Sequence, residues 1–126
     1  MSFDWSQNIV FITGASSGIG RSLAIELGRM GATVGLLARR AESLREIVSE
    51  VEAAGGRALA LPADVKDARA VRAAADQLRE RFGRVDVLVA NAGIAGTTDA
   101  IDLQPDEVAN VINVNVLGAV NSVTAV

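Results

Sequence analysis

Short apolar runs of strand length alternate along the chain with longer segments in which apolar residues recur at helical spacing. The short runs are nearly continuous in apolar residues, which is typical of parallel strands covered on both faces. These expected strands are 9–12, 33–37, 58–61 and 85–90. The segments between them place apolar residues at i, i+3, i+4 and i+7, which predicts amphipathic helices. The expected helices are roughly 18–30, 41–54 and 67–82.

This order of elements contains three β-α-β crossovers. Crossovers between parallel strands are almost always right-handed, so the first half of a dinucleotide-binding sheet has the strand order 3-2-1-4. No linker, repeat or low-complexity segment interrupts the pattern. Residues 1–126 therefore predict a single α/β unit, an incomplete Rossmann-type doubly wound parallel sheet of four strands with flanking helices.

The segment 105–126 differs from the other expected helices because apolar residues surround most of its circumference. A surface helix carries a single apolar stripe. We therefore expect this helix to be packed against other parts of a protein on several sides. The strand at 85–90 is left at the edge of the sheet. We therefore expect the sequence to be the first part of a longer domain, and we expect the strand 85–90 and the helix 105–126 to associate with a partner or to form a homo-oligomer.

Composition narrows the function classes. Half of the residues are hydrophobic but only 3% are aromatic, and the net charge is −3. Arginines are dispersed among the acidic residues, which disfavours a nucleic-acid partner. No basic leader and no uninterrupted apolar run of membrane-spanning length is present, so we expect a cytoplasmic protein with no membrane partner. The chain has no cysteine and no histidine, so no metal site is expected.

A glycine-rich loop, Thr-Gly-Ala-Ser-Ser-Gly-Ile-Gly at 13–20, joins the first expected strand to the first expected helix. Its glycines let backbone N–H groups approach an anion, and the helix behind contributes unpaired amides and the positive end of its dipole. This setting favours a phosphate-bearing ligand over a merely structural turn. The expected cofactor-binding residues are Gly14, Ser16, Ser17, Gly18, Ile19 and Gly20.

Two arginines, Arg39 and Arg40, follow the second expected strand. NAD-binding sheets usually carry an acidic side chain there, which accepts a hydrogen bond from the ribose 2′-OH. A guanidinium instead pairs with a 2′-phosphate. The residues therefore favour NADP(H) over NAD(H), with Arg39 as the stronger candidate; a solvated corner is the alternative interpretation.

Taken together, these motifs resemble the classical short-chain dehydrogenase/reductase family along the whole chain. The loop at 13–20 resembles the TGxxxGxG cofactor loop of that family. Further residues resemble its adenine-contacting Asp-Val pair, its NAG motif and the helix asparagine of its catalytic tetrad. The resemblance assigns adenine contact to Asp64 and Val65, cofactor contact to Asn91, Ala92 and Gly93, and a catalytic role to Asn115.

Each of these assignments has a structural alternative. Asp64 is also a plausible helix cap or loop acid, and the NAG segment could be only a turn. Asn115 lies in a valine-rich helix, where an unpaired amide would cost about 1–3 kcal/mol. Its amide therefore needs a partner, whether water, backbone or a catalytic relay, and the nearby Asn113 is the natural control.

The resemblance implies carbonyl–alcohol redox, with hydride exchanged between nicotinamide and a small-molecule carbonyl or alcohol substrate. In the family, a serine and a Tyr-x-x-x-Lys pair move the proton, and both lie beyond the fourth helix. This chain has no tyrosine, and its single lysine, Lys66, follows the third expected strand. Ser122 and Thr124 are too early to be the family serine. We therefore predict that these 126 residues bind the cofactor but do not turn over substrate by themselves.

Two other hypotheses remain open. The first is a non-catalytic nucleotide-binding or interaction module, which would use the edge strand and the apolar last helix to recruit a partner. The second is a flavodoxin-like regulatory domain with strand order 2-1-3-4, against which the glycine loop and Arg39 argue.

Overall fold

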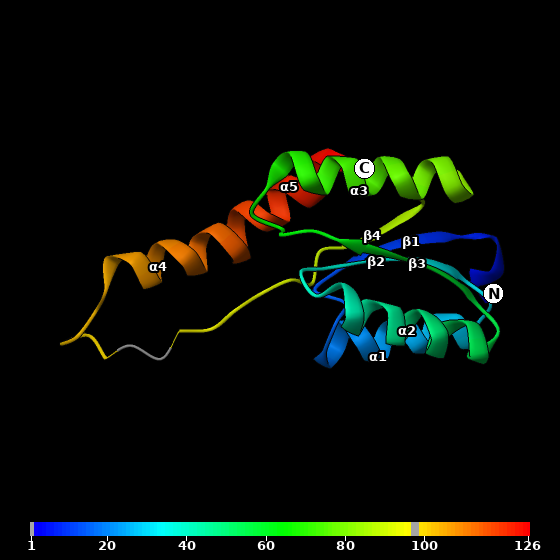
Figure 1. Cartoon of the computed structure of the whole chain (residues 1–126), viewed down its shortest axis with the longest axis horizontal. Helices are drawn as coiled ribbons and strands as arrows, with labels where there is room; N and C mark the ends of the chain where they lie inside the picture. The colour runs from blue at the N-terminus through cyan, green and yellow to red at the C-terminus, as the bar shows by residue number, and fades with distance from the viewer. Residues whose placement is uncertain (1, 97–98) are drawn as a thin grey trace.

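A computed structural model describes residues 2–96 and 99–126, and its four strands form one parallel sheet in the order β3-β2-β1-β4 (Figure 1). The predicted order 3-2-1-4 is therefore confirmed. Register places Val10 opposite both Val34 and Val87. The strands are β1 (Ile9–Thr13), β2 (Thr33–Ala38), β3 (Arg57–Pro62) and β4 (Val87–Val89).

Strand β4 is shorter than the expected strand at 85–90 because a side chain takes over part of the ladder. The Asp86 carboxylate accepts the Ile9 N–H at 3.0 Å, and the Asp86 N–H donates to the Ile9 carbonyl at 2.9 Å. The backbone N–H of Ile9 and the guanidinium of Arg84 together hold the pKa of Asp86 below its usual value. Among the described strands, β4 has a neighbour on one side only, so it lies at an edge of the sheet as expected.

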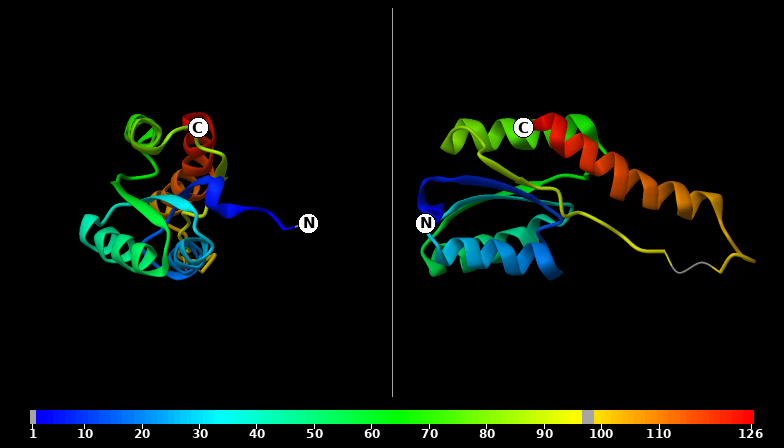
Figure 2. Two further views of the ribbon diagram at one scale, coloured as in Figure 1. Left: turned by 90° about the vertical axis from the view of Figure 1, so that its right-hand side faces the viewer. Right: turned by 180° about the vertical axis from the view of Figure 1, so that it is seen from behind.

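Helices cover both faces of the sheet. A short 3₁₀ turn, η1 (Trp5–Gln7), precedes β1. Helices α1 (Gly18–Arg29) and α2 (Ala41–Ala54) lie on one face, and α3 (Ala68–Phe82) lies on the other (Figures 1 and 2). Asp67 caps α3, since its carboxylate accepts the N–H groups of Arg69 and Ala70. The helix thus begins one residue later than predicted, because the cap itself is not helical.

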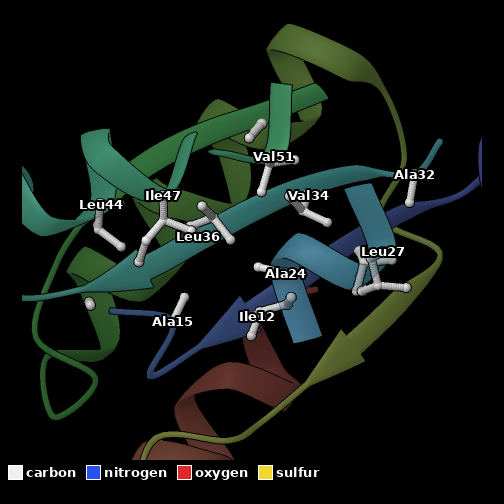
Figure 3. Packing of buried hydrophobic residues seen from close by; sticks show 13 residues of the cluster. Ile12, Ala15, Ala24, Leu27, Ala32, Val34, Leu36, Leu44, Ile47 and Val51 are labelled. Atoms are coloured by element: carbon white, nitrogen blue, oxygen red, sulfur yellow. The ribbon is translucent and has the colours of Figure 1, made fainter. Parts of the chain in front are cut away.

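The core consists of two aliphatic layers, one on each face of the sheet. Every residue of β1 and β2 is buried, as the nearly continuous apolar runs predicted. In the layer under α1 and α2, Ile12, Val34 and Leu36 of the strands meet the helix side chains (Figure 3). Small residues allow this close packing: a Cβ added at Gly56 would lie 2.6 Å from the Gly28 Cα. Aliphatic side chains and small residues thus fill the core, and among its described buried residues only Phe11 is aromatic.

The last helical segment begins as α4 (Pro105–Ile112), widens into one π-helical stretch, η2 (Asn113–Leu117), and ends as α5 (Gly118–Ala125). Helix α5 packs against α3, while α4 extends away from the sheet (Figures 1 and 2). The Arg79 guanidinium of α3 donates to the Ala125 carbonyl at 3.0 and 3.1 Å, which anchors the end of α5.

Much of this segment is exposed although it is apolar, as its all-round pattern predicted. The exposed aliphatic residues are Val108, Ile112, Val116, Leu117, Val120 and Val123.

Among the described residues, Pro105–Ala125 is the one helix long and apolar enough to cross a membrane, with a mean hydropathy of 1.3. The search for an uninterrupted apolar run did not indicate this helix. Asparagines interrupt its apolar residues, although its mean hydropathy stays high. Core helices of globular proteins meet the same criterion, so it is weak support for a membrane span. That the chain has no membrane partner stays a prediction.

Candidate functional site

The glycine loop takes the conformation its sequence predicted for an anion cradle. Gly14 and Gly18 have φ values of 65° and 55°, a region that disfavours residues with a side chain. Helix α1 begins at Gly18, and the Ser17 side chain forms no capping hydrogen bond. The first-turn amides of α1 are therefore available to a ligand at the carboxyl end of β1.

A cavity of about 890 Å³ opens at this carboxyl edge of the sheet. Its volume suits a cofactor-sized ligand, and ligands of doubly wound sheets bind at this edge. Of the predicted cofactor-binding residues, all but Gly20 line it. These are Gly14, Ser16, Ser17, Gly18, Ile19, Arg39, Arg40, Asp64, Val65, Asn91, Ala92 and Gly93.

Gly20 lies behind the loop rather than in the cavity wall, where its lack of a side chain allows close packing. A Cβ at this position would lie 2.4 Å from the Gly14 carbonyl oxygen and 2.7 Å from Asn91 Nδ2. Gly20 is buried within helix α1. Its contribution to the site is therefore to let α1 pack under the loop, and direct cofactor contact by Gly20 stays a prediction.

We expect Gly20→Ala to lower the free energy of unfolding by about 1–3 kcal/mol, because backbone atoms crowd the added methyl group. Ser17→Ala in the same loop is the control. It should change stability by less than about 0.5 kcal/mol, since the exposed Ser17 hydroxyl makes no cap bond. Urea unfolding followed by circular dichroism measures both. Equal stability of the two variants would contradict the packing role of Gly20.

Reciprocal hydrogen bonds join the glycine loop to the NAG segment. The Thr13 hydroxyl accepts the backbone N–H groups of Asn91 and Ala92, both at 3.1 Å. In return, Asn91 Nδ2 donates to the carbonyls of Thr13 and Gly14 at 3.2 and 3.1 Å. The Asn91 side chain therefore holds the ends of β1 and β4 together, and the cavity wall at 91–93 is offered by small residues and backbone.

Arg39 and Arg40 lie at the end of β2 with exposed side chains. Within residues 2–96 and 99–126, neither guanidinium pairs with a carboxylate. Both line the cavity, so they give this end of it unneutralised positive charge. Their exposure also fits the alternative of a solvated corner, so the assignment of either arginine to a 2′-phosphate stays a prediction.

Val65 is buried at the end of the sheet and fits closely against α5. A Cβ at Gly118 would lie 2.8 Å from Val65 Cγ1, and Asn121 Nδ2 donates to the Val65 carbonyl at 3.0 Å. Asp64 is half-buried beside it, and its Oδ1 accepts the backbone N–H of Lys66 at 3.0 Å. The third strand and the last helix are thus fixed relative to each other next to the cavity.

The side-chain amide of Asn115 is hydrogen-bonded to backbone. The sequence had left three possible partners open: water, backbone and a catalytic relay. Oδ1 accepts the Ile94 N–H and Nδ2 donates to the Ile94 carbonyl, both at 2.8 Å. Asn115 lies in the η2 stretch and does not line the cavity. It therefore ties the segment after β4 to the helix, with one N–H and one lone pair left for a further partner. Its catalytic role stays a prediction.

Several cavity residues were not predicted from the sequence. Lys66, Asn110 and Val114 reach the cavity from the turn after β3 and from the last helix, and Ile94 continues the wall beyond the NAG segment. Lys66 Nζ lies 3.2 Å from Asn110 Oδ1, a contact between residues far apart in the chain that no local motif indicates. In the described part of the chain, no cluster of acidic side chains could hold a metal ion.

Comparisons with known proteins agree with this geometry. The model of the short chain dehydrogenase family matches residues 8–126. The chain is 38% identical over 118 residues to oxidoreductase Lin0452 of Listeria innocua, covering 94% of this chain and 48% of the relative. It is 38% identical over 112 residues to a 3beta-hydroxysteroid dehydrogenase of Mediterraneibacter gnavus, covering 88% of this chain and 41% of the relative.

Solved structures give the same result. A short-chain type dehydrogenase/reductase from Mycobacterium marinum superposes with a TM-score of 0.93 at 34% identity, covering 97% of this chain and 49% of that protein. The chain thus spans about half the length, or somewhat less, of the proteins that it matches. Its glycine loop, strand order and sequence place it in one family: the chain belongs to the short-chain dehydrogenase/reductases, oxidoreductases that bind NAD(P)(H).

Proposed function

We propose that these residues are the cofactor-binding portion of an NADP(H)-dependent short-chain oxidoreductase, which exchanges hydride with a small-molecule carbonyl or alcohol. The observation that carries the NADP(H) preference is Arg39 at the end of β2. Its guanidinium pairs with no carboxylate among the described residues, and it lies in the wall of the same cavity as the glycine loop. A carboxylate at this place would repel a 2′-phosphate, whereas a guanidinium pairs with it.

The residues present fit a dinucleotide. A Cβ at Gly14 would lie 2.7 Å from the Ala92 Cα, so only glycine leaves the loop its close approach to the NAG segment. The pyrophosphate would meet the loop and the first-turn amides of α1, where the helix dipole favours negative charge. Arg39 and Arg40 would hold the 2′-phosphate. Asp64 and Val65 would face the adenine, and the backbone of 91–93 would lie along the rest of the cofactor.

When bound, the nicotinamide supplies or accepts the hydride, and the protein must supply the proton for the substrate oxygen. The residue types best suited to that task, tyrosine and histidine, are missing from these 126 residues, and the one lysine lies in the turn after β3. Asn115 can position the segment after β4 but cannot act as the acid. We therefore infer that residues 1–126 bind the cofactor without turning over substrate.

A second candidate, an interaction module, draws on a separate observation. The exposed aliphatic side chains of 105–126 and the edge strand β4 are suited to association with protein. This role is compatible with the first, since the face would serve a second copy or another part of an oxidoreductase. We propose that the protein acts in the cytoplasm as a homo-oligomer.

Equilibrium titration with NADPH and NADH, followed by nucleotide fluorescence, tests the proposal directly. We expect saturable binding of NADPH and weaker binding of NADH. Failure to bind either nucleotide would leave the interaction module as the better explanation. Equal affinities would retain the dinucleotide site and refute the NADP(H) preference.

A further inference from the structure

Lys66 is the third cation in the cavity wall, but its surroundings differ from those of Arg39 and Arg40. Its Nζ lies 3.8 Å from Asp64 Oδ2 and donates to Asn110 Oδ1 at 3.2 Å. Among the described residues, the two arginines have no acidic partner. The positive charge of Lys66 is therefore largely paired within the protein. The positive charges of Arg39 and Arg40 are available to a ligand anion.

The backbone and side chain of Lys66 act on the same carboxylate. The Lys66 N–H donates to Asp64 Oδ1 at 3.0 Å, and Nζ faces Oδ2. One oxygen of Asp64 is thus held by a backbone hydrogen bond, and the other lies in a longer charged contact with the same residue. Rotation of the carboxylate about its terminal bond would break one of these contacts, so its orientation toward the cavity is restricted.

Asn110 extends this arrangement to the last helix. It lies on α4 and lines the cavity beside Lys66. Two further contacts, from Gly118 and Asn121, fix the neighbouring Val65 to α5. The last helix therefore contacts the turn after β3 at Val65 and at the Lys66 side chain itself, which keeps the Lys66 ammonium beside Asp64.

This arrangement contributes little to overall stability. The Lys66 and Asp64 side chains are 37% and 39% exposed, and their charged atoms are 3.8 Å apart. Exposed ion pairs of this kind have small effects on folding, because water screens them and ordering the side chains costs entropy. The same contacts act on a ligand by a comparably small factor, because a preoriented acceptor does not have to be ordered when the ligand binds.

We propose that Lys66 is a positioning residue for recognition of the nucleotide base. By bonding one oxygen of Asp64, placing its charge beside the other and linking to Asn110, it orients the carboxylate to accept a hydrogen bond from the exocyclic amine of adenine. This inference rests on the proposed nucleotide-binding function. It predicts discrimination between adenine, which carries that amine, and hypoxanthine, which carries a carbonyl oxygen in its place.

The experiment compares the affinity of the purified protein for NADP, its hypoxanthine analogue and NAD. The unsubstituted protein should bind the adenine form at least about tenfold more tightly than the hypoxanthine form. Lys66→Met should reduce this ratio to within about threefold, and leave the ratio of NADP to NAD affinity unchanged. Lys66→Arg should retain most of the discrimination, and Asn110→Ala should lose part of it.

Two further variants calibrate the result. Asp64→Asn removes the charged acceptor and should abolish the base discrimination. Arg69→Met removes an exposed cation near the turn, outside the cavity wall, and should leave every ratio unchanged. Circular dichroism identifies any variant that fails to fold. If Lys66→Met is unfolded, Asn110→Ala decides the question: partial loss of the base discrimination supports the role of Lys66, and full retention refutes it.

Each outcome supports or overturns the inference. Loss of base discrimination in Lys66→Met and Asp64→Asn but not in Arg69→Met supports it. Loss in Asp64→Asn alone refutes the role of Lys66 while leaving nucleotide binding intact. A fall in the NADP-to-NAD ratio of Lys66→Met would show that Lys66 binds the 2′-phosphate, which also refutes it. If the unsubstituted protein binds no nucleotide, the proposed function fails and the inference fails with it.

Discussion

Arg39→Asp should reverse the cofactor preference of this protein. We expect NADP affinity to fall by about 10- to 100-fold, which corresponds to loss of one charged, bidentate hydrogen-bonded contact. NAD affinity should rise, because the new carboxylate can accept a hydrogen bond from the ribose 2′-OH. Titration of the variant with both nucleotides measures the two effects separately.

The control for the change in net charge is Arg45→Asp. Arg45 is exposed on α2 and does not line the cavity, so its reversal should leave the ratio of NADP to NAD affinity almost unchanged. Arg40→Asp should give an intermediate effect if this residue contributes mainly positive potential. An unchanged ratio in Arg39→Asp would refute the assignment of Arg39 to the 2′-phosphate.

Ionic strength provides an independent check on the same contact. Arg39 is exposed, so its attraction for a phosphate should weaken as salt shortens the Debye length from about 10 Å at 0.1 M to about 3 Å at 1 M. In the unsubstituted protein, the ratio of NADP to NAD affinity should therefore be smaller at about 1 M salt than at about 0.1 M salt. In Arg39→Asp, added salt should instead weaken the repulsion of NADP.

The sequence predicted those parts of the site that depend on strand ends. Parallel strands place their carboxyl termini along one edge of the sheet, so residues after β1, β2, β3 and β4 could be assigned to one cavity without knowledge of side-chain positions. The glycine loop and Arg39 were found in this way, whereas Asp64 was assigned through the family resemblance, to which its place after the third strand added support. Gly20 was predicted with the same motif but packs behind the loop, because a glycine pattern does not separate ligand contact from close backbone packing.

The remaining features depend on contacts between distant segments. The bond between Lys66 and Asn110 joins a turn to a helix, and the pairing of Asn115 with Ile94 joins that helix to the segment after β4. Each requires the orientation of the last helix, which its all-round apolar pattern does not specify. The π-helical stretch that carries Asn115 has no sequence signal that we recognised, and the shortened β4 follows from a side-chain bond of Asp86.

Residues 1–126 should bind NADP(H) and yet show no measurable oxidoreductase turnover. Hydride transfer to a carbonyl leaves negative charge on the substrate oxygen, and a positioned general acid is typically worth about 10²- to 10⁴-fold in rate. These residues contain no tyrosine and no histidine. Absorbance of NADPH, followed across a panel of ketones with the purified 126-residue protein, measures the rate. Clear enzymatic turnover would refute the inferred lack of catalysis.

The positive counterpart is a chain extended by a segment with the serine and the Tyr-x-x-x-Lys pair of the family, which should be active. In that chain, Asn115→Ala should lower kcat while largely sparing NADP affinity, because Asn115 itself does not line the cavity and the relay role that the resemblance assigns to it acts on the chemical step. Asn113→Ala, in the same π-helical stretch, should have a smaller effect. If Asn115→Ala weakened NADP binding and left kcat unchanged, Asn115 would act by shaping the cofactor site, and its assignment to the catalytic relay would be wrong.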